Sequence, residues 1–204
     1  MKLTKILKVK GDWQDVVDDC RASVGKPPLG QEPSWKFKRA VLVSEHSPIR
    51  NIAIRWIWWL PYWVAMHWKT HIWYSVVKSQ RNDRQDDYDR TKAPQDAPVS
   101  LTGDANVQHL IDTMRKRLCF QASTDTRLHA EDLKETIMEE VDEHIGWVMV
   151  PNCIYRGGCP EMNCCGFYQN LRIQDPDVGS HDIHKRYDAY NKAFKARKAT
   201  REGK

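Results

Sequence analysis

The strongest structural signal in the chain is Asn51-Ile-Ala-Ile-Arg-Trp-Ile-Trp-Trp-Leu-Pro-Tyr-Trp-Val-Ala-Met-His67. In its first half, Ile52, Ile54, Trp56 and Trp58 occupy alternate positions, which is the two-residue period of a strand with one buried face. We therefore expect a strand here, with its tryptophans packed on one face of a sheet. A stacking platform for nucleic-acid bases is the less favoured interpretation of the same residues.

The second half of this stretch predicts a helix. Pro61 suits the first turn of a helix, where its missing N–H costs nothing, so the helix should run from Tyr62 to His71. His67 and His71 would then share one face, but a metal site there lacks a third ligand. The apolar run is also too short to cross a membrane, because Arg55 and His67 bound it.

The rest of the pattern completes an α/β fold in which helices cover a twisted sheet. The second of two long helices should be capped by Thr124 or Asp125. The expected elements are a helix over 12–24, a strand at 40–43, a polar loop over 78–104, helices over 105–120 and 126–144, an irregular segment after Gly146 and a solvated, frayed helix in the basic tail rather than a nucleic-acid arm.

Composition indicates an ordinary globular protein. The chain has 204 residues, 41% hydrophobic and 29% charged, with a formal net charge of +5, which suits one domain with a tail. No secretory signal is visible at the N-terminus, so we expect a cytoplasmic protein. Four cysteines, Cys153, Cys159, Cys164 and Cys165, would then be reduced thiols or ligands of zinc or an iron–sulfur cluster, although their spacing is not a standard zinc pattern.

Three segments resemble the flavin-dependent thymidylate synthases in order and in internal spacing. The first is Ser44-Glu-His-Ser-Pro-Ile-Arg-Asn51, which is similar to the family's His-x-Thr/Ser-Pro-x-Glu-His stretch. The resemblance implies that Ser47 contributes a hydroxyl to FAD. Arg50 and Asn51 replace the Glu and His of the family.

The second segment is Pro61-Tyr-Trp-Val-Ala-Met-His-Trp-Lys-Thr-His-Ile72. It resembles the family's Pro-x-x-Val-x-Arg-Gln-x-x-Arg-His-Arg helix. His71 matches the central histidine, which implies a contact with the cofactor. Thr70 and Ile72 stand where the family has the flanking arginines.

Polar residues after this helix complete the second segment. Ser79-Gln80-Arg81 resembles the family's Ser-x-Arg, and Arg90 with Pro94 matches an Arg-x-x-x-Pro element. The resemblance implies that Ser79, Gln80, Arg81 and Arg90 bind substrate, Ser79 and Arg81 through its phosphate. Arginine suits this role because guanidinium is always charged and forms paired hydrogen bonds with oxyanions.

The third segment, Arg117-Leu-Cys-Phe-Gln-Ala-Ser-Thr-Asp-Thr-Arg127, resembles the family's Arg-Leu-x-x-x-Ala-Gln-x-Glu-Ile-Arg. Asn106 and Asp112 fall where the family has polar contacts with FAD. By the same resemblance Arg117 is the catalytic residue, which contacts the pyrimidine ring and stabilises its developing negative charge.

The resemblance implies methylation of dUMP to dTMP with FAD as cofactor and NADPH and methylenetetrahydrofolate as co-substrates, in a homotetramer. Residues 1–150 would form the synthase-like domain, followed by a Cys-rich segment and basic tail at 151–204. We expect neither a membrane nor nucleic acid as partner. Three alternatives stay open: an enzyme that modifies dCMP or transfers hydroxymethyl, a non-catalytic protein that binds metal or nucleic acid, and a homologue that no longer binds flavin.

Overall fold

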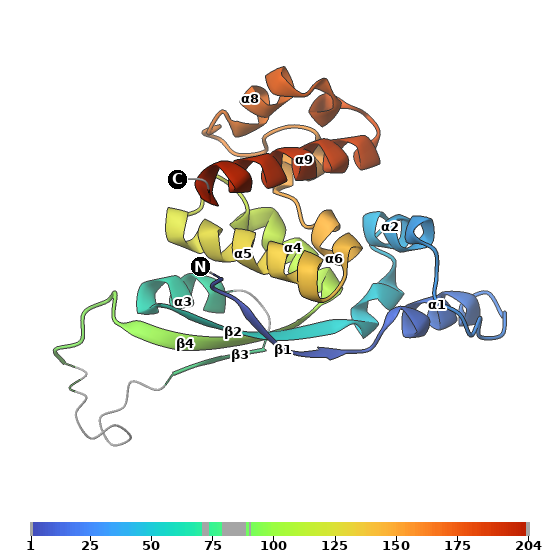
Figure 1. The fold of residues 1–204 in the computed structure, drawn as a ribbon, viewed down its shortest axis with the longest axis horizontal. Coiled ribbons are helices and arrows are strands. Elements are labelled where there is room, and N and C mark those ends of the chain that lie inside the picture. Colours follow the sequence, from blue (N-terminus) through green and yellow to red (C-terminus); the bar gives the residue numbers. More distant parts are fainter. Residues whose placement is uncertain (1, 71–73, 79–88, 90, 203–204) are drawn as a thin grey trace.

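The computed structural model describes residues 2–70, 74–78, 89 and 91–202, and Figure 1 shows a layered arrangement. The lowest layer is an antiparallel four-stranded sheet in the order β1-β2-β4-β3. Its strands are β1 (Lys5–Lys10), β2 (Ala53–Pro61), β3 (Tyr74–Val77) and β4 (Pro98–Asn106). Helices lie on one face of the sheet, and within the described residues the opposite face carries no helix (Figure 1).

The predicted tryptophan-rich strand is confirmed as β2. Ile54, Trp56 and Trp58 are fully buried, whereas Trp59 on the opposite face is 67% exposed. The Trp58 indole N–H donates to the Thr4 hydroxyl at 2.7 Å, so this large ring is buried without an unsatisfied donor. Helix α3 (Tyr62–Lys69) follows directly, with Pro61 at its N-cap. The predicted helix is thus confirmed up to Lys69, and His71 lies outside the described residues.

The N-terminal helix is confirmed as α1 (Trp13–Ala22), which Asp12 caps through a capping box. The strand predicted at 40–43 is wrong, because these residues end helix α2 (Trp35–Val43). The Ser34 hydroxyl accepts from the Phe37 N–H at 3.3 Å and starts this helix. A four-residue apolar run does not by itself distinguish a strand from one face of a buried helix.

The polar loop predicted over 78–104 is wrong at its C-terminal end, where β4 begins at Pro98. Val99, Leu101 and Ala105 are buried at alternate positions of β4. The strand pairs with β2 along its whole length, with Gly103 opposite Trp56. Small and polar residues between the buried positions conceal this alternation in the sequence.

The two predicted central helices are confirmed, with different boundaries. They are α4 (Val107–Arg117) and α5 (Thr124–Glu140), and a separate helix α6 (Glu143–Val148) follows. Asp142 starts α6 by accepting from the backbone N–H groups of His144 and Ile145 at 2.8 and 3.1 Å. The N-cap position of α5 is Ser123, so the predicted Thr124 or Asp125 cap is wrong.

The C-terminal quarter forms a further helical layer above α4, α5 and α6 (Figure 1). It contains α7 (Asn152–Arg156), α8 (Phe167–Gln174) and α9 (Ile183–Glu202). The helix predicted for the basic tail is confirmed as α9, but its expected full solvation is wrong, because Tyr187, Tyr190 and Phe194 join the same hydrophobic core as the sheet residues. Among the described helices, none is long and apolar enough to cross a membrane.

Candidate functional site

Arg117 is the last residue of α4 and its guanidinium reaches the end of α3. Its Nη2 donates to the carbonyl oxygen of His67 at 2.8 Å and to the Thr70 hydroxyl at 3.3 Å. The side chain is half-buried, and burial lowers the pKa of Arg117. An arginine nevertheless stays protonated at neutral pH, and the C-terminal carbonyls of a helix favour a cation beside them. The structure therefore fixes a positive charge between α3 and α4.

The second and third segments of the family resemblance meet at His67. The imidazole Nδ1 of His67 lies 3.1 Å from the Thr126 hydroxyl at the start of α5. The Ser123 hydroxyl in turn donates to Thr126 at 2.7 Å. Together with the Arg117 contact, these bonds join the C-terminal end of α3 to both sides of the turn between α4 and α5. Residues that are about 50 positions apart in the sequence thus form one polar junction.

The first segment is joined to the first and last turns of α4 through Glu45. Its carboxylate accepts from Gln108 Nε2 at 2.6 Å and forms an ion pair with Arg115. Burial would raise the pKa of Glu45, but the hydrogen bonds from Arg115 and Gln108 hold it below its usual value. The Arg115 guanidinium also stacks 3.7 Å from the centre of the Tyr155 ring. This network connects α4 to both the first segment and α7.

The sequence did not predict the Glu45 network. In the structure, the backbone conformation of Glu45 distinguishes this residue. Glu45 has a φ of 52°, in the left-handed region that residues other than glycine seldom adopt. Such a conformation persists when surrounding contacts hold it. Here the pairing with Arg115 supplies those contacts, and Glu45 lies inside the stretch that resembles the family. Its place in that stretch could have marked the Glu45 carboxylate as a candidate functional group. The sequence contained no sign that Arg115 is its partner.

Three of the four predicted flavin contacts lie near the N-terminal half of α4. Ser47 is exposed at the start of the 3-10 helix η1 (Ser47–Asn51), which packs against α4. Asn106 caps α4, and its side-chain oxygen accepts from the His109 N–H at 2.9 Å. Asp112 is exposed and accepts from Arg115 Nη1 at 3.1 Å. The structure thus gathers these residues around one helix.

Arg117 lies at the opposite end of that helix. The 11 residues of α4 give it a length of about 16 Å at 1.5 Å per residue. A ligand that contacts both ends must therefore be extended, or two ligands must lie side by side. The remaining predicted contacts, His71, Ser79, Gln80, Arg81 and Arg90, lie outside the described residues.

A pocket of about 450 Å³ lies beyond Arg117, between α8 and α9. Phe120 and Phe167 form part of its wall, with their rings stacked 4.2 Å apart. The Arg197 guanidinium lies over both rings, 5.5 and 5.2 Å from their centres. The described residues that line this pocket include no carboxylate. Its chemistry suits a planar or anionic group.

The cysteines were a second predicted site, as possible metal ligands. All six are free thiols, and Cys153 is buried whereas Cys164 and Cys165 are exposed. Across the described part of the chain, no three His, Cys, Asp or Glu side chains are arranged to hold a metal ion.

Known proteins resemble this chain in structure but not in sequence. No protein-family model matches it, and no curated protein matches its sequence. The UMP/dUMP methylase PolB from Streptomyces cacaoi, solved with bound 5-Br dUMP, superposes with a TM-score of 0.56. The two chains share a fold. Sequence identity is 12%, and the match covers 71% of this chain and 93% of PolB.

The likeness to PolB confirms the predicted α/β class, with a sheet covered by helices. PolB is described as a UMP/dUMP methylase and was solved with bound 5-Br dUMP. At least one protein of this fold therefore binds a pyrimidine nucleotide. Fold alone does not fix activity, because functional sites differ among proteins of one fold.

Proposed function

We propose that this protein is a flavin- and folate-dependent methyltransferase that converts dUMP to dTMP. The observation that carries the proposal is the fold shared with a UMP/dUMP methylase. The junction at His67 supports it, because two of the three segments that resemble the synthases make direct contact there through Arg117 and Thr126.

Arg117 has the chemistry that the methylation of a pyrimidine requires. The ring carries carbonyl oxygens on which negative charge develops as its C5 carbon reacts. A guanidinium has five N–H donors in a rigid fork, and His67 and Thr70 hold one side of this fork in place. A positive donor that is already oriented stabilises developing charge without reorganising. We assign Arg117 this role.

FAD would bind along the N-terminal half of α4, with NADPH and methylenetetrahydrofolate as co-substrates. Ser47 offers a hydroxyl and Asp112 an exposed carboxylate on this surface, and Asn106 adds an amide. This set of donors and acceptors fits the hydrogen-bonding groups of a flavin nucleotide. When bound, the flavin would supply the hydride that completes the methyl group, while the protein positions and polarises the nucleotide.

We also propose assembly into a homotetramer. The uncovered sheet face exposes Trp59 and Val76, which are 67% and 47% accessible. Large apolar side chains on a bare sheet suit burial by another copy of the chain. Mass measurement of the purified protein in solution tests this directly.

The first test is an absorbance titration of the purified protein with FAD, followed by dUMP, UMP and dCMP. Flavin that stays with the protein on gel filtration, with a spectral shift on adding one nucleotide, is the expected result. UMP is included because PolB is named for both nucleotides, and dCMP tests the alternative substrate. A protein that retains neither flavin nor nucleotide contradicts the proposal and favours a homologue without this activity.

Substitution of Arg117 tests its role. Arg117→Ala should lower nucleotide turnover by about 100-fold, as expected when a donor to a developing oxyanion is removed. Arg117→Lys retains the charge and should recover part of the loss. The neighbouring Lys116→Ala is the matched control, because its side chain is 61% exposed, and it should stay within about twofold. Equal turnover in Arg117→Ala and Lys116→Ala would remove Arg117 from the mechanism.

A further inference from the structure

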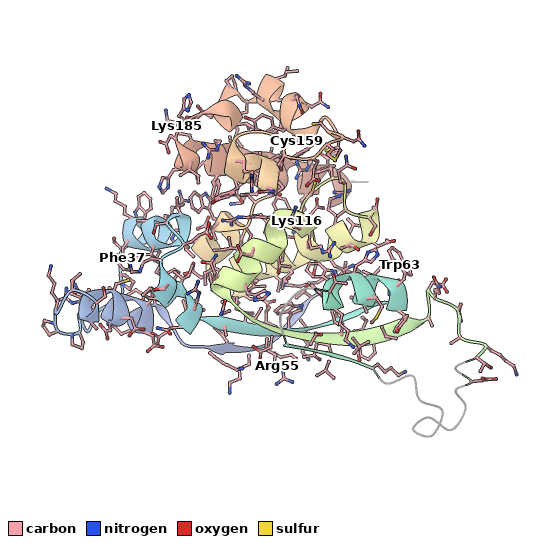
Figure 2. All side chains as sticks on the ribbon, turned by 180° about the vertical axis from the view of Figure 1, so that it is seen from behind. Phe37, Arg55, Trp63, Lys116, Cys159 and Lys185 are labelled. Atoms are coloured by element: carbon pink, nitrogen blue, oxygen red, sulfur yellow. The ribbon has the colours of Figure 1, made fainter. Side chains whose placement is uncertain are left out.

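The cysteines cluster around the loop between α7 and α8. Cys119, Cys153, Cys159 and Cys165 are close enough to influence one another electrostatically. Within this cluster, the thiols of Cys159 and Cys164 lie close enough for each to shift the pKa of the other. Figure 2 shows Cys159 in the upper helical layer, well away from Trp63 of α3. Two neighbouring thiols at the molecular surface have a chemistry that the proposed methylation does not use.

Cys164 has the environment of a reactive thiol. It is exposed, and its sulfur accepts from the backbone N–H of Gly166 at 3.4 Å, directly before α8 begins at Phe167. It also lies 3.2 Å from Gln169 Oε1. The Gly166 N–H, with Gln169 and Cys159, lowers the pKa of Cys164. Because thiolates are the nucleophiles, Cys164 should react before its neighbours.

Cys159 has the complementary environment. The backbone N–H of Glu161 lowers the pKa of Cys159, but burial and the adjacent Cys164 outweigh this and raise it overall. Cys164 therefore ionises more readily than Cys159. The deeper Cys153 is different again, because burial raises its pKa to about 12 and leaves it inert. The surroundings thus distinguish one attacking thiol and one resolving thiol.

The loop that carries the pair is held in place. The side-chain amide of Gln121 donates to the carbonyl oxygen of Asn163. Lys116 Nζ lies 3.7 Å from the carboxylate of Glu161. Both tethers come from the C-terminal end of α4 and the turn after it. With only four residues between the two cysteines, closing a ring between them costs little chain entropy.

We propose that Cys159 and Cys164 form a reversible dithiol–disulfide pair that peroxide oxidises. The Cys164 thiolate attacks one peroxide oxygen, which breaks the O–O bond and gives a sulfenic acid and hydroxide. The Cys159 sulfur then attacks the Cys164 sulfur, and the sulfenic oxygen leaves as water with the Cys159 proton. The two thiols together lose two electrons, which reduce the peroxide. A thiol reductant reverses the reaction by exchange.

The test uses the full-length protein and hydrogen peroxide at a stoichiometric amount. Intact mass and non-reducing peptide mapping should show the loss of two hydrogen atoms and a cross-link between Cys159 and Cys164, which dithiothreitol reverses. Cys159→Ser should instead accumulate a Cys164 sulfenic acid that dimedone traps. Cys164→Ser should give neither product. Cys20→Ser is the control, because Cys20 contacts His46 and lies outside the cluster, and it should behave like the parent.

Three results would overturn the proposal. One is a cross-link between other cysteines in the parent protein. Another is unchanged peroxide reactivity in Cys164→Ser. The third is stoichiometric zinc by elemental analysis with all the loop thiols protected, which would make the cluster a metal site. Circular dichroism of each reduced variant verifies that it is folded, so loss of the cross-link cannot be a result of unfolding.

Discussion

Lys134 shows how far the interior of this protein departs from an apolar core. Its side chain is fully buried, and its Nζ donates to the carbonyl oxygen of Gly146 at 2.6 Å and to Asn191 at 2.7 Å. Asn191 then donates to the carbonyl oxygens of Trp147 and Tyr187. This chain of bonds connects α5, α6 and α9. Burial, with Lys195 and Arg197 nearby, lowers the pKa of Lys134 well below its usual value.

Stability should therefore depend on pH through Lys134. Between the native and the unfolded pKa, the unfolded chain binds the extra proton, so this lysine makes the protein more stable as pH rises towards 10. Lys134→Met lacks this effect. The unfolding free energy of the parent minus that of Lys134→Met should rise from pH 7 to pH 9, by up to about 1.4 kcal/mol per pH unit.

Urea unfolding of both proteins at each pH measures this difference, in which titration of the other groups largely cancels. Lys192→Met is the control, because its side chain is 82% exposed. Parallel pH profiles for the parent and Lys134→Met would show that Lys134 stays protonated in the folded state.

At the scale of elements, the pairing of β2 with β4 depends on Gly103. A methyl group at this position would lie 2.5 Å from the Trp56 ring, which is itself fully buried. Trp56 and Trp58 also contact each other edge to face at 5.4 Å. The central strands accommodate two neighbouring tryptophans because the facing strand has no side chain at this point.

Gly103→Ala should therefore destabilise the protein by about 1–3 kcal/mol, the usual cost of overpacking a filled core. Gly158→Ala is the matched control, since nothing lies within 4 Å of its added methyl group, and it should change stability by less than about 0.5 kcal/mol. Urea midpoints compare the two. Similar midpoints would mean that the Trp56 ring moves aside freely.

At the scale of the molecule, α9 lies between α8 and the layer of α4, α5 and α6 (Figure 1), and it contacts both α6 and α7. Tyr187, Tyr190 and Phe194 are buried along it. Arg186 at its start donates to the carbonyl oxygens of Ile154 and Tyr155 in α7. The helix is thus a structural part of the core, although its many lysines and arginines suggest a solvated tail.

Deletion of residues 183–204 should abolish cooperative thermal unfolding. Loss of one buried aromatic side chain costs about 3–5 kcal/mol, and a whole domain is stable by about 5–15 kcal/mol. Calorimetry should show no sharp transition for the truncated chain. Lys192→Ala in the intact chain is the control, because its side chain is 82% exposed, and it should melt like the parent. A cooperative transition after truncation would show that the lower layers fold alone.

Local pattern determined the parts of the fold in which one face of an element is continuously apolar. The alternation from Ile52 to Trp58 and the proline at 61 predicted β2 and α3, and the similar periodicity of α1, α4 and α5 predicted those helices. For the candidate site, the sequence predicted Arg117 and the residues around α4 through a resemblance in spacing to a family. These signals are contained within single segments of the sequence, so they can be recognised without knowing which other segments pack against them.

Only the tertiary structure decided the rest. Residues 40–43 became helical through α2, and 98–104 became a strand because β2 pairs with it. The basic helix α9, expected to be solvated, became part of the core because its aromatic face is covered. The contacts of Arg117 with His67 and of Glu45 with Arg115 join positions 50 and 70 residues apart. The physical reason is common to all of them: burial and ion pairing depend on surfaces that distant segments supply, and a local pattern contains no record of those surfaces.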